Sequence, residues 1–229
     1  MEVKVLTVQE SILGANEEQA RKNQERLDKY GILTINVMSS PGAGKTSLIL
    51  QTINRLEPKT RVAVIEGDVA SRVDADKVHE QGAPVVQINI PGGCHLDANM
   101  TENALNHLPL EEIDLLIIEN VGNLICPAEF DLGEHKKVML LSVPEGDDKP
   151  YKYPLVFTEA NVVLINKIDL LPYLDFNTAA FTQAVIGLNP KARIYPVSCK
   201  TGDGLEGWFS WLGDEIKQMK MATGHGCKR

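Results

Sequence analysis

The chain has 229 residues, of which 43% are hydrophobic, and its formal net charge is −8. This length supports one large α/β domain with a substantial buried core. The acidic balance excludes a protein that coats nucleic acid, because such binding depends on Lys and Arg side chains that neutralise phosphates.

No apolar run approaches the ~20 residues that span a bilayer, and the N-terminus lacks the basic start and apolar core of a signal peptide. We therefore expect a cytoplasmic protein without a membrane partner. The four cysteines, Cys94, Cys126, Cys199 and Cys227, are far apart and form no Cys-x-x-Cys pair. In a reducing compartment this spacing predicts metal binding or redox chemistry and not a disulfide scaffold.

The first 30 residues are predicted to form an arm. A β-like run covers residues 3–8, a turn covers 14–16, and a charged, amide-rich helix covers 17–30. Asn16, with Gln19 three residues later, fits the N-cap of that helix. The helix has few apolar residues, so its predicted buried face is thin, and both a solvated surface helix and a partner- or dimer-contacting arm fit the pattern. We place residues 1–30 apart from a main domain of residues 31–229.

The main domain alternates β-branched runs with helical stretches, which predicts βαβ units around a parallel sheet. The predicted strands cover residues 33–38, 62–66, 85–90, 115–119, 138–143, 162–166 and 193–197. The predicted helices cover residues 45–56, 72–81, 99–108, 178–188 and 205–221. Ligands of such sheets bind outside the carboxyl ends of the strands, so functional residues are expected directly after each strand.

The first of these strands leads into a P-loop. Its phosphate-binding residues are predicted to be Pro41, Gly42, Ala43, Gly44, Lys45, Thr46 and Ser47. Gly42 and Gly44 let the backbone turn so that N–H groups point at phosphate oxygens. Lys45 is expected to reach the β- and γ-phosphates, and the Thr46 hydroxyl to ligate Mg²⁺. The usual pattern opens with Gly, where this chain has Ser39. The predicted fold is a P-loop NTPase, a three-layer αβα structure with a mostly parallel sheet of about seven strands.

Acidic residues end two further strands. Asp68 follows the strand at 62–66, and Glu119 ends the strand at 115–119. A carboxylate at either position can organise Mg²⁺, directly or through water, and Gly122 lets the backbone approach the γ-phosphate. Thr46, Asp68 and Glu119 are the predicted magnesium ligands.

Lys45, Asp68 and Glu119 are the predicted catalytic residues. The sequence shows no obvious arginine finger, and the residue that positions the attacking water is open between Asp68 and Asp74. Hydrolysis is therefore expected to be slow and switch-like.

A base-reading motif, Asn166-Lys167-Ile168-Asp169, follows the strand at 162–166 and resembles the guanine-specificity box of GTPases. The Asp169 carboxylate can accept hydrogen bonds from both N1–H and the exocyclic amine of guanine, whereas adenine has no N1–H donor. A second base-contact loop, Ser198-Cys199-Lys200, follows the last strand, and Cys199 is interpreted there as a packing residue. These motifs, in this order, predict a GTPase that binds GTP and GDP.

Two loops at the same edge of the sheet carry metal-binding side chains. Cys94 and His95 are adjacent in a Gly-bearing loop, and Cys126 lies seven residues beyond Glu119. Two sulfurs and one imidazole suit Zn²⁺, and also Ni²⁺ if the geometry flattens. A symmetric dimer can complete the open site by bringing two such loops together.

The ordered motifs Ser-Ser-Pro-Gly-Ala-Gly-Lys-Thr, Glu-Gly-Asp-Val, Cys-His-Leu-Asp-Ala, Ile-Glu-Asn-Val-Gly-Asn-Leu-Ile-Cys-Pro and Asn-Lys-Ile-Asp resemble the hydrogenase nickel-incorporation GTPases of the HypB type. The resemblance spans roughly residues 30 to 215. It implies a GTP-dependent homodimer that helps to deliver Ni²⁺ to the large-subunit precursor of nickel–iron hydrogenase. It also implies a small zinc- and nickel-binding accessory protein as partner, and it assigns the metal role to Cys94, His95 and Cys126. Residues 1–30 contain neither Cys nor His, so a nickel-storing N-terminus is not expected.

Three other functions stay open. A urease accessory GTPase shares the P-loop and base box, but its Cys-Pro-His metal motif is absent because Ala128 follows Cys126-Pro127. A P-loop metabolic kinase or ligase needs a substrate pocket and does not need Asp169. A GTP-regulated binding module with structural cysteines is the third. At the C-terminus, His225 and Cys227 offer an auxiliary metal contact or belong to a frayed terminus.

Overall fold

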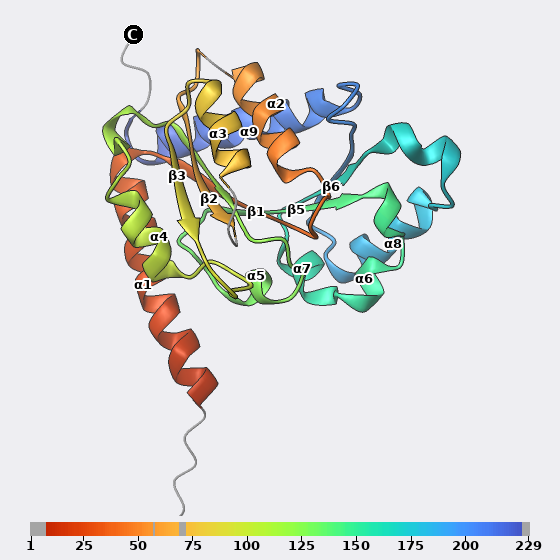
Figure 1. The fold of residues 1–229 in the computed structure, drawn as a ribbon, viewed down its shortest axis with the longest axis horizontal. Coiled ribbons are helices and arrows are strands. Elements are labelled where there is room, and N and C mark those ends of the chain that lie inside the picture. Colours follow the sequence, from red (N-terminus) through yellow and green to blue (C-terminus); the bar gives the residue numbers. More distant parts are fainter. Residues whose placement is uncertain (1–7, 57, 69–71, 226–229) are drawn as a thin grey trace, which may run out of the picture.

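The computed structural model describes residues 8–56, 58–68 and 72–225, and the side chains among them from residue 13 onward. Seven strands form one sheet in the order β3-β2-β4-β1-β5-β6-β7, and every neighbouring pair is parallel (Figure 1). The strands are β1 (Leu33–Ser39), β2 (Val62–Asp68), β3 (Val85–Asn89), β4 (Leu115–Glu119), β5 (Lys136–Ser142), β6 (Val162–Asn166) and β7 (Arg193–Pro196). The predicted three-layer αβα fold with about seven strands is confirmed, and each predicted strand is present with ends shifted by at most about two residues.

Helices cover both faces of the sheet. One face packs against α2 (Lys45–Leu56), α3 (Val73–Glu80) and α9 (Leu205–Ala222). The other face packs against α1 (Val8–Tyr30), α4 (Ala98–Leu105), α5 (Cys126–Glu129), α7 (Pro154–Glu159) and α8 (Thr178–Leu188), with α6 (Lys149–Lys152) beside α7 and α8. Short 3₁₀ turns are η1 (Leu110–Glu112), η2 (Val143–Glu145) and η3 (Ile168–Tyr173). The sequence did not predict α5, α6 and α7, because a helix of four to six residues is too short to show helical periodicity.

The central strand β1 contributes to both layers of the core. Leu33, Ile35 and Val37 point into the cluster formed with α2 and α9. The alternate positions, Thr34 and Asn36, face the opposite layer and are both 0% exposed. A fully buried amide such as that of Asn36 needs hydrogen-bond partners, because leaving it unpaired in an apolar environment is costly.

Helix α1 corrects the predicted N-terminal arm. It runs without a break through 14–16, so the predicted turn there and the N-cap at Asn16 are wrong. Val8 is already helical, and residues 3–7 of the predicted β-like run lie outside the described residues. The Asn16 amide donates to the Asp131 carbonyl at 2.8 Å, and its oxygen accepts from the Ala98 N–H at 2.9 Å. Asn16 therefore serves partners about one hundred residues away instead of its own helix end.

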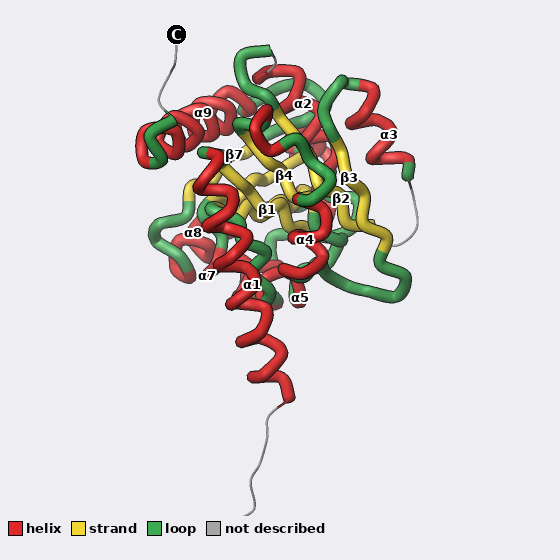
Figure 2. The backbone as a smooth tube through the Cα atoms, turned by 90° about the vertical axis from the view of Figure 1, so that its left-hand side faces the viewer, coloured by secondary structure: helices red, strands yellow, loops and turns green. Residues whose placement is uncertain are grey.

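The buried stripe of α1 is partly polar. Asn16, Ala20, Asn23 and Leu27 follow helical spacing, and each is at most 5% exposed. Asn23 donates to the Leu132 carbonyl at 3.0 Å and to the carbonyl of Ala98, the first residue of α4. Figures 1 and 2 show that the C-terminal part of α1 lies against the body, whereas its N-terminal part stands clear of it. Two asparagines in place of apolar residues explain why the sequence showed only a thin hydrophobic face.

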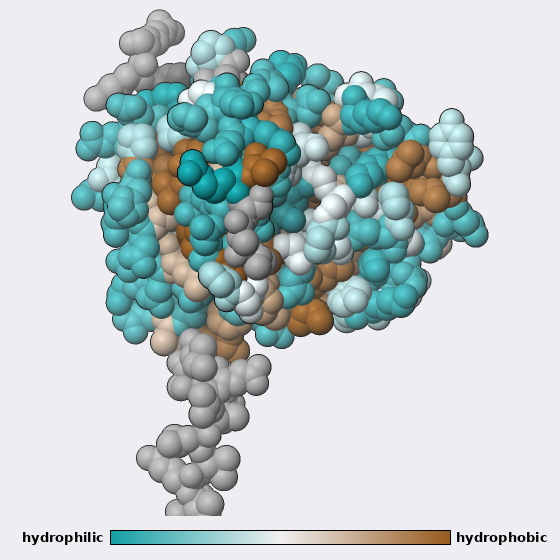
Figure 3. Space-filling view, viewed as in Figure 1, coloured by the Kyte–Doolittle hydropathy of each residue, from teal (hydrophilic) through white to brown (hydrophobic). Residues whose placement is uncertain are grey.

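The described surface is mostly hydrophilic in the view of Figure 3, with separate hydrophobic patches between polar side chains. Across residues 8–56, 58–68 and 72–225, no helix combines the length and apolar character that crossing a bilayer requires.

Leu27→Ala is expected to lower the free energy of unfolding by about 2–5 kcal/mol, because it leaves a cavity under α1 at a side chain that is 0% exposed. Arg21→Ala, on the exposed side of the same helix, is the control and should change stability by no more than about 0.5 kcal/mol. Urea denaturation measures both values. Wild-type stability in the Leu27→Ala protein would mean that α1 is an independent arm.

Candidate nucleotide and metal site

A cavity of about 300 Å³ lies at the carboxyl ends of the strands. The P-loop, the end of β2 and the segment 119–122 line it, together with Asp74. The predicted residues Pro41, Gly42, Lys45, Asp68, Glu119 and Gly122 all line this cavity. A larger hollow of about 610 Å³ lies between α1 and α9 and contains none of the predicted site residues. The residues predicted to bind phosphate and magnesium therefore gather around the smaller, polar cavity.

Lys45, the first residue of α2, lies among hydroxyl and carboxyl groups. Its Nζ donates to Ser39 Oγ at 3.1 Å, so the serine that replaces the usual glycine positions the lysine. The hydroxyl of Thr46 donates to Glu119 Oε1 at 3.1 Å. Glu66 is directly opposite Glu119 in the parallel pairing of β2 with β4. The strand register thus places the carboxyl group of Glu66 beside that of Glu119, the predicted magnesium ligand.

Burial governs the ionisation of this cluster. Burial raises the pKa of Glu66 to about 8, with a further contribution from the charge of Glu119. It likewise raises the pKa of Glu119 to about 7 and lowers the pKa of Lys45. Within the described chain, Oε2 of Glu66 and Oε2 of Glu119 are buried without a hydrogen-bond partner. Unpaired carboxylate oxygens beside Thr46 and Asp68 fit a hard divalent cation such as Mg²⁺, which takes oxygen ligands.

Gly122 brings the segment after β4 against the P-loop. A Cβ at this position would lie 2.9 Å from the backbone nitrogen of Pro41, so any larger residue would force the two segments apart. The contact places residues 119–122 where they can respond to a group bound in the P-loop.

The predicted base-reading loops are tied directly to the P-loop. Asn166 donates to the Ala43 carbonyl at 2.9 Å and accepts from the Cys199 N–H at 3.1 Å. Lys167, which has a left-handed backbone with φ 62°, donates from Nζ to the Gly42 carbonyl at 2.7 Å. Gly44 allows this packing, since a Cβ there would lie 2.5 Å from Asn166 Nδ2. Phosphate loop and base loops form one hydrogen-bonded unit.

The carboxylate of Asp169 is held in place by Ser198, whose hydroxyl donates to Oδ1 at 2.6 Å. Cys199 is buried, and burial raises the pKa of its thiol to about 11, which agrees with a packing role. Ser47 and Lys200 are exposed.

The predicted metal ligands converge at one point. Cys94 Sγ lies 3.1 Å from Cys126 Sγ and 3.4 Å from His95 Nδ1, and the three donor atoms all lie within 4.8 Å of one another. His95 stacks on Phe130 with ring centroids 4.0 Å apart, and burial lowers the pKa of its imidazole. A neutral imidazole keeps a lone pair for a metal.

The hydrogen bond that Cys94 donates to Cys126 raises the pKa of the Cys94 thiol. Metal binding at this site must therefore displace a proton, as thiolate coordination requires. With two sulfurs and one nitrogen, the donor set fits Zn²⁺ or Ni²⁺ and leaves one position open.

Asn123 connects the loop that carries Cys94 to the loop that carries Cys126. Its amide donates to the Cys94 carbonyl at 3.3 Å, and its oxygen accepts from the Ile125 N–H at 3.0 Å. Of the two C-terminal residues predicted as an auxiliary metal contact, His225 and Cys227, Cys227 lies outside the described residues. His225 contacts Thr223 through Nδ1, at 3.1 Å from the carbonyl.

Sequence reasoning missed three polar residues of this site, namely Glu66, Asn120 and Asn123. The available signal was polar residues at or just beyond the ends of otherwise apolar strands. Glu66 ends the apolar run of β2, Asn120 follows β4 directly, and Asn123 lies four residues beyond the end of β4. Only the strand register shows that Glu66 and Glu119 are neighbours.

The chain matches the model of the CobW/HypB/UreG nucleotide-binding domain over residues 33–196. It is 46% identical over 209 residues to the hydrogenase maturation factor HypB of Rhizobium leguminosarum bv. viciae, covering 91% of this chain and 70% of that protein. The chain belongs to the HypB group of the CobW/HypB/UreG family. The resemblance inferred from the motifs is therefore confirmed.

Two further HypB proteins extend the match. The probable hydrogenase maturation factor HypB of Methanocaldococcus jannaschii is 41% identical over 218 residues, covering 95% of this chain and 99% of that protein. A crystal structure of HypB from Helicobacter pylori in complex with nickel superposes with a TM-score of 0.85 at 38% identity, covering 89% of this chain and 96% of the other. The HypB group is thus matched over nearly all of this chain in sequence and in fold.

In protein free of metal and nucleotide, Glu66 and Glu119 are expected to lower the free energy of unfolding as pH rises from about 4.5 to about 8. Their raised pKa values mean that these two side chains bind more protons in the folded chain than in the unfolded chain in this window, so their deprotonation costs stability. Glu66→Gln should flatten this slope, whereas Glu80→Gln at an exposed position should not. Urea denaturation across the window measures the slope, and an unchanged slope in Glu66→Gln would contradict the assignment.

Proposed function

We propose that this protein is a GTP-hydrolysing nickel chaperone that assists nickel insertion into nickel–iron hydrogenase. The observation that carries the proposal is the convergence of Cys94, His95 and Cys126 on loops that flank the nucleotide cavity. The HypB relatives are named as hydrogenase maturation factors, and one of them was crystallised with nickel. Nickel is the cargo in this proposal, and GTP supplies the switch.

The nucleotide is proposed to bind with its phosphates on the P-loop. Lys45 and the N-terminal end of α2 face the phosphates, and the hydroxyl of Thr46 and the carboxylates of Glu119 and Asp68 hold Mg²⁺. The bound cation supplies charge neutralisation for the developing phosphate oxyanions. Glu119, whose Oε2 is buried without a hydrogen-bond partner among the described residues, would hold the cation in its ionised form.

Hydrolysis is proposed to be slow. No arginine is present among the described residues that line the cavity, so Lys45 is the one cationic side chain among them that can stabilise the transition state. Asp74 and Asp68 line the same cavity and are the candidates for positioning the attacking water. A slow reaction suits a switch, because the GTP-bound state lasts long enough to be read by a partner.

The base specificity is proposed to come from Asp169. Its carboxylate has one oxygen engaged by Ser198 and can accept from the guanine N1–H and exocyclic amine. This arrangement favours a GTPase over an ATP-dependent kinase or ligase, since adenine offers no matching donor edge.

Asp169→Asn is expected to weaken GDP binding about 10- to 150-fold, which corresponds to the 1.5–3 kcal/mol of a hydrogen bond to a charged group. Xanthosine diphosphate should bind the variant better than it binds wild type, because the asparagine amide can donate to the carbonyl that replaces the guanine amine. Competition against a fluorescent nucleotide measures both affinities. Asp175→Asn, at an exposed position in the same region, is the control. Equal GDP affinity in Asp169→Asn would remove this residue from the base site.

A homodimer is proposed to complete the metal site. Three donors from one chain leave a four-coordinate metal one ligand short, and a two-fold axis beside the metal loops supplies ligands from the second copy. Ile125, beside Cys126, is 54% exposed and gives this surface an apolar side chain to bury. The further partners in this proposal are a small nickel- and zinc-binding accessory protein and the precursor of the hydrogenase large subunit, in the cytoplasm.

A urease is the second candidate recipient of nickel. One relative, from Helicobacter pylori, is named a hydrogenase/urease maturation factor and is 38% identical over 224 residues. The donor set of this chain, with Ala128 after Cys126-Pro127, differs from the Cys-Pro-His motif of urease accessory GTPases. Hydrogenase therefore stays the first candidate.

Cys94→Ala and Cys126→Ala are each expected to lower the Ni²⁺ affinity, because each removes a ligand. Loss of a residue that only supports a ligand lowers metal affinity by about 10- to 100-fold, and the loss of a ligand should lower it by more than that. Calorimetric titration of the apo, GDP-bound and GTP-analogue-bound protein measures the affinity, and the wild-type affinity should depend on the nucleotide. Cys199→Ala is the matched control, since that buried thiol lies in the base loop. Unchanged nickel binding in Cys94→Ala and Cys126→Ala would overturn the metal assignment and leave the nucleotide assignment intact.

A further inference from the structure

Asn120 follows Glu119 directly. It connects residues 120–122, here called the nucleotide loop, to residues 94–96, here called the metal loop. Its side-chain oxygen accepts two hydrogen bonds, from the Val121 N–H at 2.9 Å and from the Leu96 N–H at 3.2 Å. Val121 lines the nucleotide cavity, and Leu96 is the residue next to His95. One buried oxygen, on a residue that is 0% exposed, thus holds the backbone of both loops.

A shared acceptor couples the two loops. If Val121 and Gly122 move toward a γ-phosphate, the Asn120 oxygen must follow them or lose a hydrogen bond in a site closed to water. The Leu96 N–H donates to the same oxygen, so it must also move with that oxygen or lose its hydrogen bond. Movement at the nucleotide therefore shifts the backbone beside His95.

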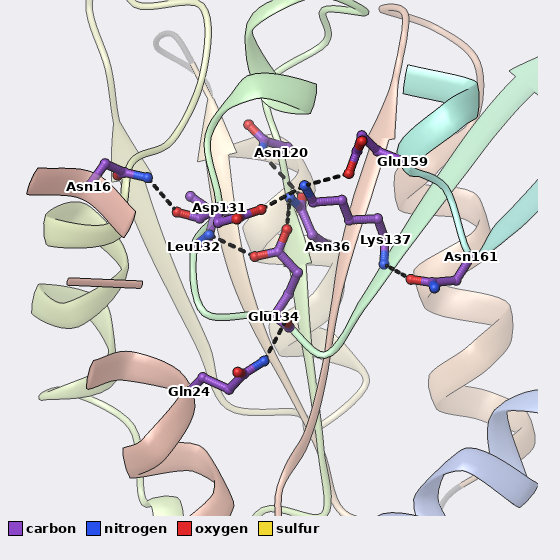
Figure 4. Close-up of polar contacts among 10 residues, drawn as sticks. All are labelled: Asn16, Gln24, Asn36, Asn120, Asp131, Leu132, Glu134, Lys137, Glu159 and Asn161. Atoms are coloured by element: carbon purple, nitrogen blue, oxygen red, sulfur yellow. Dashed lines mark hydrogen bonds and ion pairs between the residues drawn. The ribbon is translucent and has the colours of Figure 1, made fainter. Parts of the chain in front are cut away.

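Two backbone N–H donors fix the orientation of the Asn120 amide, and a buried relay continues from its nitrogen. Asn120 Nδ2 donates to Asn36 Oδ1 at 3.2 Å, and Asn36 Nδ2 donates to Glu134 Oε1 at 3.0 Å. Glu134 Oε2 accepts from the Leu132 N–H at 2.7 Å, so the carboxyl group accepts at both oxygens (Figure 4). Because the Asn120 oxygen faces the Val121 and Leu96 N–H groups, its nitrogen faces the Asn36 oxygen, and the Asn36 nitrogen faces Glu134.

Side-chain packing adds a contact between Leu96 and the end of β2. Leu96 is 0% exposed, and its side chain lies against Gly67, where a Cβ would come within 2.8 Å of Leu96 Cγ. Gly67 lies between Glu66 and Asp68 at the end of β2. Leu96 is therefore held through its backbone by Asn120 and through its side chain by the acidic end of β2.

We infer that Asn120 is the positioning residue that transmits the nucleotide state to the Cys94–His95–Cys126 metal site. The inference rests on the proposed function, in which nickel affinity depends on the bound nucleotide. The side chain of Asn120 is buried, and it acts through Val121 and Leu96. Asn123 also joins the loops, but it lies at the half-exposed rim and lacks a buried relay behind it.

The test is the ratio of Ni²⁺ affinities in the GDP-bound and GTP-analogue-bound protein, compared between wild type and Asn120→Ala. Wild type should show a ratio of at least about 5-fold, the lower end of ordinary coupling between sites. Asn120→Ala should bind nickel in both states with a ratio near one. A general loss of stability lowers both affinities together and does not change their ratio.

Asn189→Ala is the matched control. Asn189 is a partly buried asparagine whose amide donates to the carbonyls of Phe157, Thr158 and Ala160, far from both loops. It should keep the wild-type ratio. A wild-type ratio retained in Asn120→Ala overturns the inference alone, whereas a ratio of one in wild type overturns the nucleotide-coupled part of the proposed function as well.

Amide hydrogen exchange in the wild-type protein gives a second test that needs no variant. Exchange of the GTP analogue for GDP should change the protection of the Val121 and Leu96 N–H groups by similar factors, because both donate to one oxygen. A change at Val121 with unchanged protection at Leu96 overturns the inference even if Asn120→Ala fails to fold.

Discussion

The burial of two carboxyl groups beside one lysine is the constraint on which the ligand edge of this fold depends. Parallel pairing of β2 with β4 sets Glu66 opposite Glu119, and α2 brings Lys45 to the same cavity. One ammonium group cannot satisfy two ionised carboxylates in a place with little water, so the pKa values of the acids rise. The fold holds these carboxyl groups in an electrostatically unfavourable arrangement, which a bound cation would relieve.

The need to pair buried polar groups also explains why polar side chains occur in the core. The loops beyond the strands carry backbone N–H and C=O groups that no neighbouring strand pairs, and here side-chain amides pair with them. Asn120 serves the loops after β3 and β4, and Asn16 and Asn23 serve the start of α4 and the segment before β5. The two metal-bearing loops are therefore placed by hydrogen bonds to the core and not only by their own short-range turns.

The sequence was sufficient for every strand, for the P-loop and for the convergence of Cys94 and Cys126, because these features depend on local patterns and on the rule that strand ends share an edge. It was not sufficient for Asn16, whose partners lie far along the chain, and a capping rule applied locally gave the wrong answer there. Glu66 and Asn120 were missed for a related reason. Their roles depend on which strands are neighbours in the sheet, and the sequence alone does not state the strand order.

The relay of Asn36, Asn120 and Glu134 also constrains how this family can vary. Replacing one member leaves a buried donor or acceptor unpaired. Replacing all three with apolar residues still leaves the backbone N–H groups of Val121, Leu96 and Leu132 without their acceptors. Apolar side chains at these positions are therefore expected only where another group supplies those acceptors.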